Sequence, residues 1–177
     1  MTDEIKKRLD VVLVAGGKYH DIDFARLELL KLLAEDERIR TRVYEDYSNL
    51  HAISNADFLI TYTCDVRPTL EQQKVLRDFV ANGKRWLALH GTNSILQFLS
   101  DGRVDCPRVA PIFMETLGSQ FLSHPPIEPY TVTVADGDHH LVEGVEPFQT
   151  NDELYLMETH GELHVLLETE FEGNTPG

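Results

Sequence analysis

Cysteine is scarce in this sequence, which contains only Cys64 and Cys106 among its 177 residues. The two are far apart and show no CxxC spacing, so the sequence indicates neither a disulfide framework nor a thiolate zinc site. We expect both to remain reduced, buried thiols.

Long apolar runs and an excess of positive charge are also missing. No apolar stretch approaches the roughly 20 residues of a membrane-spanning helix, and residues 1–7 lack the apolar core of a signal peptide. Acidic residues outnumber basic ones by 30 to 16, and a net charge of -14 repels phosphate backbones and anionic lipids. We therefore expect a cytoplasmic protein that binds neither nucleic acid nor membranes.

The remaining composition is that of an ordinary globular protein, with 42% hydrophobic and 26% charged residues. The length fits one domain with one core. Because no internal repeat, low-complexity tract or linker divides the chain, we expect a single domain over residues 1–177.

Strands and helices are predicted to alternate along the first hundred residues. Short apolar runs predict strands over 10–15, 41–45, 57–63 and 84–90. Helical spacing predicts a helix from Asp21, a second from a Thr69–Gln72 capping box to Gly83, and a third from Gly91 through Leu99. This order implies βαβ crossovers and a mainly parallel sheet, hence an α/β fold.

The predicted core lies in these strands, with helices on both faces of the sheet, because the runs lack the alternation of a solvent-facing sheet. Its residues are Val12, Leu13, Val14, Leu59, Ile60, Leu87 and Leu89. After about residue 100 the pattern becomes irregular, with a short helix over 112–117 and strands over 130–134, 154–156 and 165–167.

Polar residues follow three of the predicted strands, at the edge where open parallel sheets bind ligands. His20 follows the first strand, Asp65 the third, and His90 ends the fourth. We expect ligand-binding residues here, namely Gly16, Gly17, Tyr19, Asp65, Gly91 and Thr92. Neither GxGxxG nor GxxxxGK[ST] occurs, so a dinucleotide or nucleoside triphosphate site lacks its fingerprint.

The turn after the fourth strand is similar to a nucleophile elbow, but it holds His90 where such a turn carries serine or cysteine. A thiol mechanism is therefore disfavoured, and the catalytic candidates are His90, His20 and His124. Asp152 and Glu153 add carboxylates that we expect to bind ligand. No diagnostic spacing of metal ligands occurs, so the sequence leaves open whether the protein binds a divalent metal ion. The expectation for His139, His140, His160 and His164 is that they are exposed loop or strand-edge residues.

An ordered series of short motifs resembles the ThuA-like (trehalose utilisation) family of the class I glutamine amidotransferase-like superfamily. The motifs are Gly16-Gly17-Lys18-Tyr19-His20, Phe79-Val80-Ala81-Asn82-Gly83, Leu89-His90-Gly91, Leu117-Gly118 with Phe121 and His124-Pro125, Asp138-His139-His140, and Asp152-Glu153-Leu154-Tyr155. The resemblance covers about residues 10–170. It implies a flavodoxin-like three-layer α/β/α sandwich and a link to the metabolism of disaccharides and their keto forms.

Two departures from the family pattern accompany this resemblance. The family commonly has HisPro where this chain has His139-His140. It also usually continues into a glycine-rich strand and a GlyHis motif that do not occur before Gly177. The resemblance thus implies a domain that continues beyond Gly177.

Three functions stay open at this point. The leading hypothesis is an enzyme acting on a small-molecule carbohydrate, by proton abstraction next to a sugar carbonyl or by lyase- or hydrolase-type cleavage, with histidines and carboxylates as acid, base or metal ligands. The alternative is a non-catalytic module that binds a sugar or a partner. Glutaminase-type hydrolysis by Cys64 or Cys106 is the least favoured, and the sequence leaves a homo-oligomer open.

Overall fold

A computed structural model describes residues 7–171 of the chain. The chain forms two compact units, one up to Leu117 and one from Gly118 onward. A single domain over residues 1–177 stays a prediction. Within residues 7–171, no helix has both the length and the apolar character needed to cross a membrane.

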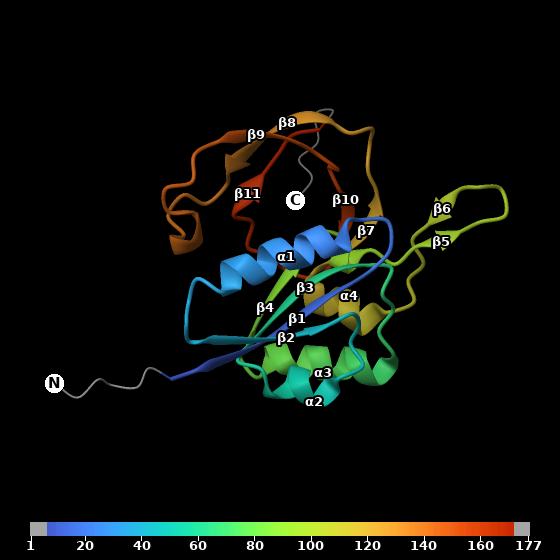
Figure 1. Ribbon diagram of the computed structural model, residues 1–177. Coiled ribbons are helices and arrows are strands. Elements are labelled where there is room, and N and C mark those ends of the chain that lie inside the picture. The colour runs from blue at the N-terminus through green and yellow to red at the C-terminus, as the bar shows by residue number, and fades with distance from the viewer. Residues whose placement is uncertain (1–6, 172–177) are drawn as a thin grey trace. The chain divides into compact units, whose positions relative to one another are not determined.

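The first unit is built on a four-stranded parallel sheet in the order β2-β1-β3-β4 (Figure 1). Its strands are β1 (Leu9–Gly17), β2 (Ile39–Tyr44), β3 (Phe58–Cys64) and β4 (Arg85–Leu89). Its α-helices are α1 (Ile22–Leu33), α2 (Leu50–Asn55), α3 (Leu70–Ala81) and α4 (Pro111–Leu117). This order is that of flavodoxin-like proteins, which confirms the predicted α/β class and parallel sheet.

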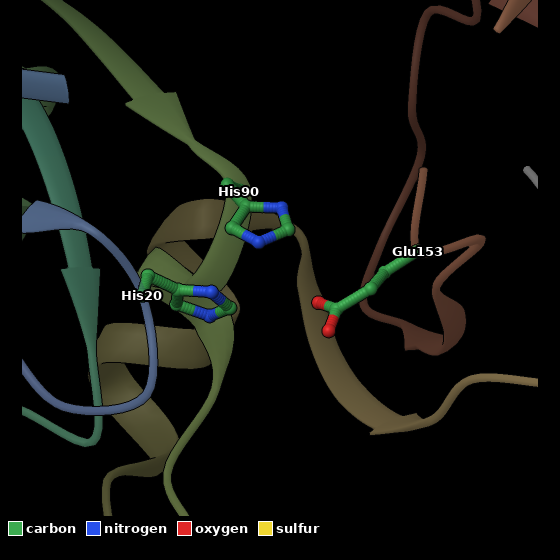
Figure 2. A group of neighbouring side chains, drawn as sticks. All are labelled: His20, His90 and Glu153. Atoms are coloured by element: carbon green, nitrogen blue, oxygen red, sulfur yellow. The ribbon is translucent and has the colours of Figure 1, made fainter. Parts of the chain in front are cut away.

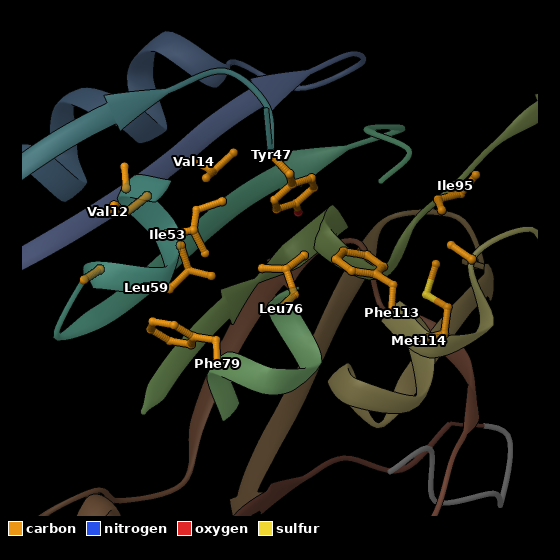
Figure 3. Packing of buried hydrophobic residues seen from close by; sticks show 13 residues of the cluster. Val12, Val14, Tyr47, Ile53, Leu59, Leu76, Phe79, Ile95, Phe113 and Met114 are labelled. Carbon is orange, nitrogen blue, oxygen red and sulfur yellow. The ribbon is translucent and has the colours of Figure 1, made fainter. Parts of the chain in front are cut away.

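Alternate residues of the central strands pack on opposite faces of the sheet. On one face Val12, Val14 and Leu59 pack with residues of α2, α3 and α4 (Figure 3). On the other face Leu13 and Ile60 pack with α1. Helices therefore cover both faces, as predicted, and these five strand residues are buried.

The predicted burial of Leu87 is wrong, because 51% of this residue is exposed. Leu87 lies beside Ile60 in the register, but β4 is the edge strand of the described sheet. Helix α1 packs mainly on β1, β2 and β3, so β4 is less covered on this face of the sheet. Leu89, two residues further along, is half-buried.

The helix predicted from Gly91 through Leu99 is also wrong. His90–Asn93 forms one 3₁₀ turn (η1), and the chain then extends into the short strand β5 (Gln97–Phe98), which pairs with β6 (Val104–Asp105). Asp65 explains this change, since its backbone N–H donates to the Ser94 carbonyl and its carboxylate accepts from the Leu96 N–H. Extended backbone here is held by long-range hydrogen bonds that local periodicity does not report.

Local signals in the sequence locate helix α3 correctly but do not reveal helix α2. Helix α3 begins after Thr69, whose side chain accepts from the Gln72 N–H while the Gln72 side chain accepts from the Thr69 N–H, as the capping box predicts. Helix α2 was not predicted. Its six residues are too short for a period to show, although Asn49 caps it by accepting from the Ala52 N–H.

The second unit is made of antiparallel strands. β7 (Ser119–Ser123) pairs with β10 (Leu156–Thr159). β8 (Glu128–Val134) lies between β9 (Phe148–Asp152) and β11 (Leu167–Glu168), and η2 (His140–Val142) is a 3₁₀ turn. The strand predicted over 130–134 is confirmed, those predicted over 154–156 and 165–167 begin two residues later, and β7 and β9 were not predicted.

The end of β1 passes very close to both neighbouring strand ends. A Cβ atom built on Gly16 would lie 2.0 Å from the carbonyl oxygen of Glu45, and one built on Gly17 would lie 1.9 Å from that of Cys64. Gly17 also has φ of 107°, a conformation that favours glycine. Glycine at these positions is therefore required by the packing of three strand ends.

We expect Gly17→Ala to lower the free energy of unfolding by about 3 kcal/mol or more, because the methyl group adds both a steric overlap and an unfavourable φ. Urea denaturation followed by circular dichroism measures this loss. Gly137→Ala is the control, since its Cβ would meet no atom within 4 Å, and we expect a change within about 0.5 kcal/mol. Equal effects of the two substitutions would show that the close approach is not rigid.

Candidate functional site

The carboxyl ends of β1, β3 and β4 lie at one edge of the parallel sheet. After β1 the chain crosses to β2 on one side, and after β2 it returns to β3 on the other side. The edge between β1 and β3 is therefore the topological switch point, where open α/β sheets leave a crevice for ligands. The predicted residues of the first unit follow these three strands.

Backbone strain is concentrated at this edge. Within residues 7–171, the residues other than glycine with positive φ are Tyr19 at 70°, Asp65 at 56° and His90 at 47°. They follow β1, β3 and β4, respectively. Left-handed backbone is unfavourable for residues with a side chain and occurs preferentially where function or tight packing requires it. The sharp turn predicted at His90 is present.

His20 and His90 are brought together at the strand ends (Figure 2). Their ring centroids are 4.4 Å apart with an interplanar angle of 67°, and a ring nitrogen of one lies within 4.8 Å of a ring nitrogen of the other. Both residues are half-buried. Each imidazole can donate or accept a proton, so the pair places two acid–base groups within reach of one small ligand.

Tyr62 is a third ring of this group that the sequence analysis missed. It stacks on His90 with centroids 5.8 Å apart and an interplanar angle of 20°, and it meets His20 edge-on at 6.3 Å. Tyr62 lies in β3, opposite Leu89 in the register. Its apolar neighbours in the sequence predict a strand, and only the strand order places its ring beside both histidines.

Asp65 is held firmly at the end of β3. Its side chain is 8% exposed, accepts from the Leu96 N–H at 3.1 Å and forms an ion pair with the Lys18 ammonium at 2.8 Å. The hydrogen bond and charge of Asp65 raise the pKa of Lys18 above its ordinary value. The Asp65 carboxylate thus ties the segments after β1 and β4 to the end of β3. Its ligand-binding role stays a prediction.

The other predicted ligand-binding residues of the first unit differ in exposure. Thr92 is buried, and its hydroxyl donates to the Leu89 carbonyl at 2.8 Å. Gly91 is buried against Cys64, whereas Tyr19 is exposed and has its ring 5.7 Å from that of Phe98. Thr92 and Gly91 therefore support the His90 turn from inside.

The remaining predicted residues belong to the second unit. His124 Nε2 lies 3.8 Å from Glu153 Oε1, and the His124 ring is 6.2 Å from that of Phe121. The Asp152 carboxylate accepts from the Glu153 N–H at 2.8 Å. The Glu153 carboxylate is therefore near His124 within this unit, and a site that joins these residues with His20 and His90 stays a prediction.

Three of the histidines that were expected to be exposed loop or strand-edge residues lie close together, and two of them, His140 and His164, are exposed. The His139 ring lies 4.6 Å from that of His140 and 5.1 Å from that of His164. His164 Nε2 is 2.6 Å from Asp136 Oδ2, and this contact holds the pKa of Asp136 below its ordinary value. His139 Nδ1 accepts from the Leu141 N–H, so this nitrogen already has a role at the start of η2.

The second unit also contains a hollow of about 750 Å³ along β8. Its lining includes Glu128, Tyr130, Glu168 and Phe171 but none of the predicted site residues. A large volume alone does not identify a reactive site. The His20–His90 pair at the switch point is the better candidate for a functional site, because it offers two acid–base groups.

Comparison with known proteins gives one matching family model and several similar solved structures, two of which are described below. The family model described as trehalose utilisation, ThuA, matches residues 10–176. A ThuA-like protein from Bacteroides uniformis is 17% identical to this chain, with a TM-score of 0.73. The match covers 93% of this chain and 69% of the Bacteroides protein. A ThuA-like protein from Parabacteroides merdae is also 17% identical, with a TM-score of 0.63, and the match covers 92% of this chain and 68% of that protein. No curated protein matches the chain.

We expect Asp65→Ala to destabilise the protein by about 2–3 kcal/mol, because alanine loses the hydrogen bond to Leu96 and tolerates a φ of 56° poorly. Asp65→Asn should lower the free energy of unfolding by less than half of the loss caused by Asp65→Ala. Asparagine retains an acceptor oxygen and adopts left-handed backbone readily. Chemical denaturation of both variants measures the difference, and equal losses would contradict the anchoring role of the acceptor.

Proposed function

Since the chain belongs to the ThuA family of trehalose utilisation, we propose that it is an enzyme that acts on a small-molecule carbohydrate at the His20–His90 pair. The observation that carries this proposal is the meeting of two imidazoles at the switch point of the sheet, 4.4 Å apart between ring centroids. The family supplies the carbohydrate context. The pair supplies the acid–base chemistry.

The chemistry that suits two adjacent imidazoles is removal of a proton next to a sugar carbonyl. One neutral imidazole takes the proton from the carbon beside the carbonyl, and the electron pair of that C–H bond moves toward the carbonyl oxygen. The other imidazole donates a hydrogen bond to this oxygen, where negative charge develops. Histidine suits both roles because its protonation changes near neutral pH.

In a keto-glycoside whose glycosidic oxygen is β to the carbonyl, the same step leads to cleavage. The enolate electron pair re-forms the carbonyl, a carbon–carbon double bond forms, and the bond to the glycosidic oxygen breaks. The leaving alcohol takes a proton from an imidazolium or from water. Oxidised disaccharides are therefore the favoured substrates, because an unoxidised sugar lacks the carbonyl that acidifies the C–H bond.

Support from the surrounding residues makes His90 the better candidate for the base. Its backbone is held at a φ of 47°, and its ring stacks on Tyr62. Thr92 and Gly91 are buried beneath the same turn. A ring held by packing on several sides loses little freedom when it meets a substrate, which is a requirement for efficient proton transfer.

We expect His90→Asn to lower turnover of a keto-disaccharide by roughly 10²-fold or more while the protein stays folded. Asparagine accepts the left-handed backbone but cannot take the proton. The measurement is the incorporation of deuterium from D₂O beside the carbonyl, followed by NMR, together with release of the leaving sugar. Keto forms of trehalose and sucrose are the substrates, and the parent disaccharides are the substrate controls.

The matched control is His51→Asn, which makes the same chemical change in helix α2, where His51 is exposed. It should retain wild-type exchange and release. Binding of the keto-sugars without exchange or release in the wild-type protein would favour the non-catalytic sugar-binding module. Wild-type rates in His90→Asn, or neither binding nor turnover of any keto-sugar, would contradict the proposal.

A further inference from the structure

We propose that His20 and His90 together bind a divalent transition-metal ion of the zinc type. The inference rests on the proposed function, because the metal would act on the carbohydrate carbonyl at that same pair, and it replaces the acid–base role of the two rings while the ion is bound. Binding of the ion, as distinct from its action on a sugar, depends only on the side chains of His20 and His90. It starts from the ring nitrogens of His20 and His90, which lie within 4.8 Å of one another.

The distance between the imidazoles suits a shared ion. Two nitrogens bound to one tetrahedral zinc ion at about 2.0–2.1 Å lie roughly 3.3 Å apart. Binding of a shared ion would therefore require a small change in the side-chain torsions of the two half-buried rings. Their interplanar angle of 67° shows that the two rings are not stacked in parallel.

The supports of the pair are rigid, as a metal site requires. His20 follows the close-packed glycines at the end of β1 and accepts through its carbonyl from the Ile22 N–H at the start of α1. His90 lies at the strained turn and stacks on Tyr62. Ligands held on strand ends and helix starts lose little conformational freedom when the ion binds.

Charge and ligand type also favour a borderline divalent cation. Two imidazolium ions at this separation repel each other, whereas two neutral rings can share one cation. The net charge of -14 raises the concentration of cations near the protein. Imidazole is a preferred ligand of Zn²⁺, Ni²⁺ and Cu²⁺ and a poor one for Mg²⁺ and Ca²⁺.

The chemical consequence follows from the coordination number. Two imidazoles leave positions on the ion for water and for oxygen atoms of a sugar, so a bound ion would polarise a carbonyl that binds there. In that state His20 and His90 hold the ion, and a ring that binds it cannot also act as the base. The proton would then pass to a water or to another group of the chain.

The test is equilibrium dialysis of the full chain, first freed of metal by chelation, against Zn²⁺, with Co²⁺ absorption spectra as a second measurement. We expect one ion per chain and a ligand-field spectrum with imidazole ligands. His20→Asn and His90→Asn should each weaken Zn²⁺ binding at least about tenfold, since each removes one of two donors. His51→Asn should bind as the wild type does.

Two results would overturn the metal site. One is wild-type Zn²⁺ affinity in both His20→Asn and His90→Asn. The other is loss of the ion in His139→Asn or His164→Asn, with both switch-point variants unaffected, which would assign the ion to the histidine group of the second unit.

Activity separates this inference from the proposed function. Turnover of keto-sugars that survives chelation, without Zn²⁺ binding at the pair, contradicts the metal site and leaves the acid–base proposal intact. Zn²⁺ binding that depends on both histidines, without turnover of any keto-sugar, supports the metal site and contradicts the proposed function.

Discussion

The close approach of three strand ends is the constraint on which the candidate site depends. Gly16 and Gly17 allow β1 to finish against the backbone of Glu45 on one side and Cys64 on the other. A side chain at either position would push the neighbouring strands apart. The chain that leaves this contact carries His20, so this backbone packing helps to set the position of the first imidazole.

The position of the second imidazole, that of His90, depends on a left-handed turn of the backbone. His90 stands at a left-handed turn, and the free energy that such a turn costs must come from the residues around it. Buried Thr92 and Gly91 lie beneath the turn, and Asp65 holds the chain that leaves it through Ser94 and Leu96. The two histidines therefore meet where two pieces of local packing converge, and the end of β3, with Cys64 and Asp65, is common to both.

The parts of this structure that could be predicted from the sequence are those with a local physical signal. Continuous apolar runs predicted β1 and β3, and the capping box at Thr69 predicted the start of α3. The placement of His20 and His90 at one edge followed from the rule that parallel strands end together. Tyr62 could not be assigned to the pair, because the side of a buried strand on which a ring lies depends on strand order and register. The helix predicted after His90 failed for the same reason, since Asp65 acts on it from about thirty residues away.

The exposed strand β4 has a consequence for how copies of this protein behave in concentrated solution. In the described sheet it is an edge strand with a half-exposed Leu87, and apolar edges of this kind can pair with the edges of other molecules. At neutral pH the charge of -14 keeps copies apart. That repulsion vanishes as the pH falls toward the isoelectric point of about 4.8, while the edge remains. Mildly acidic conditions therefore remove the charge repulsion that opposes pairing between such strand edges.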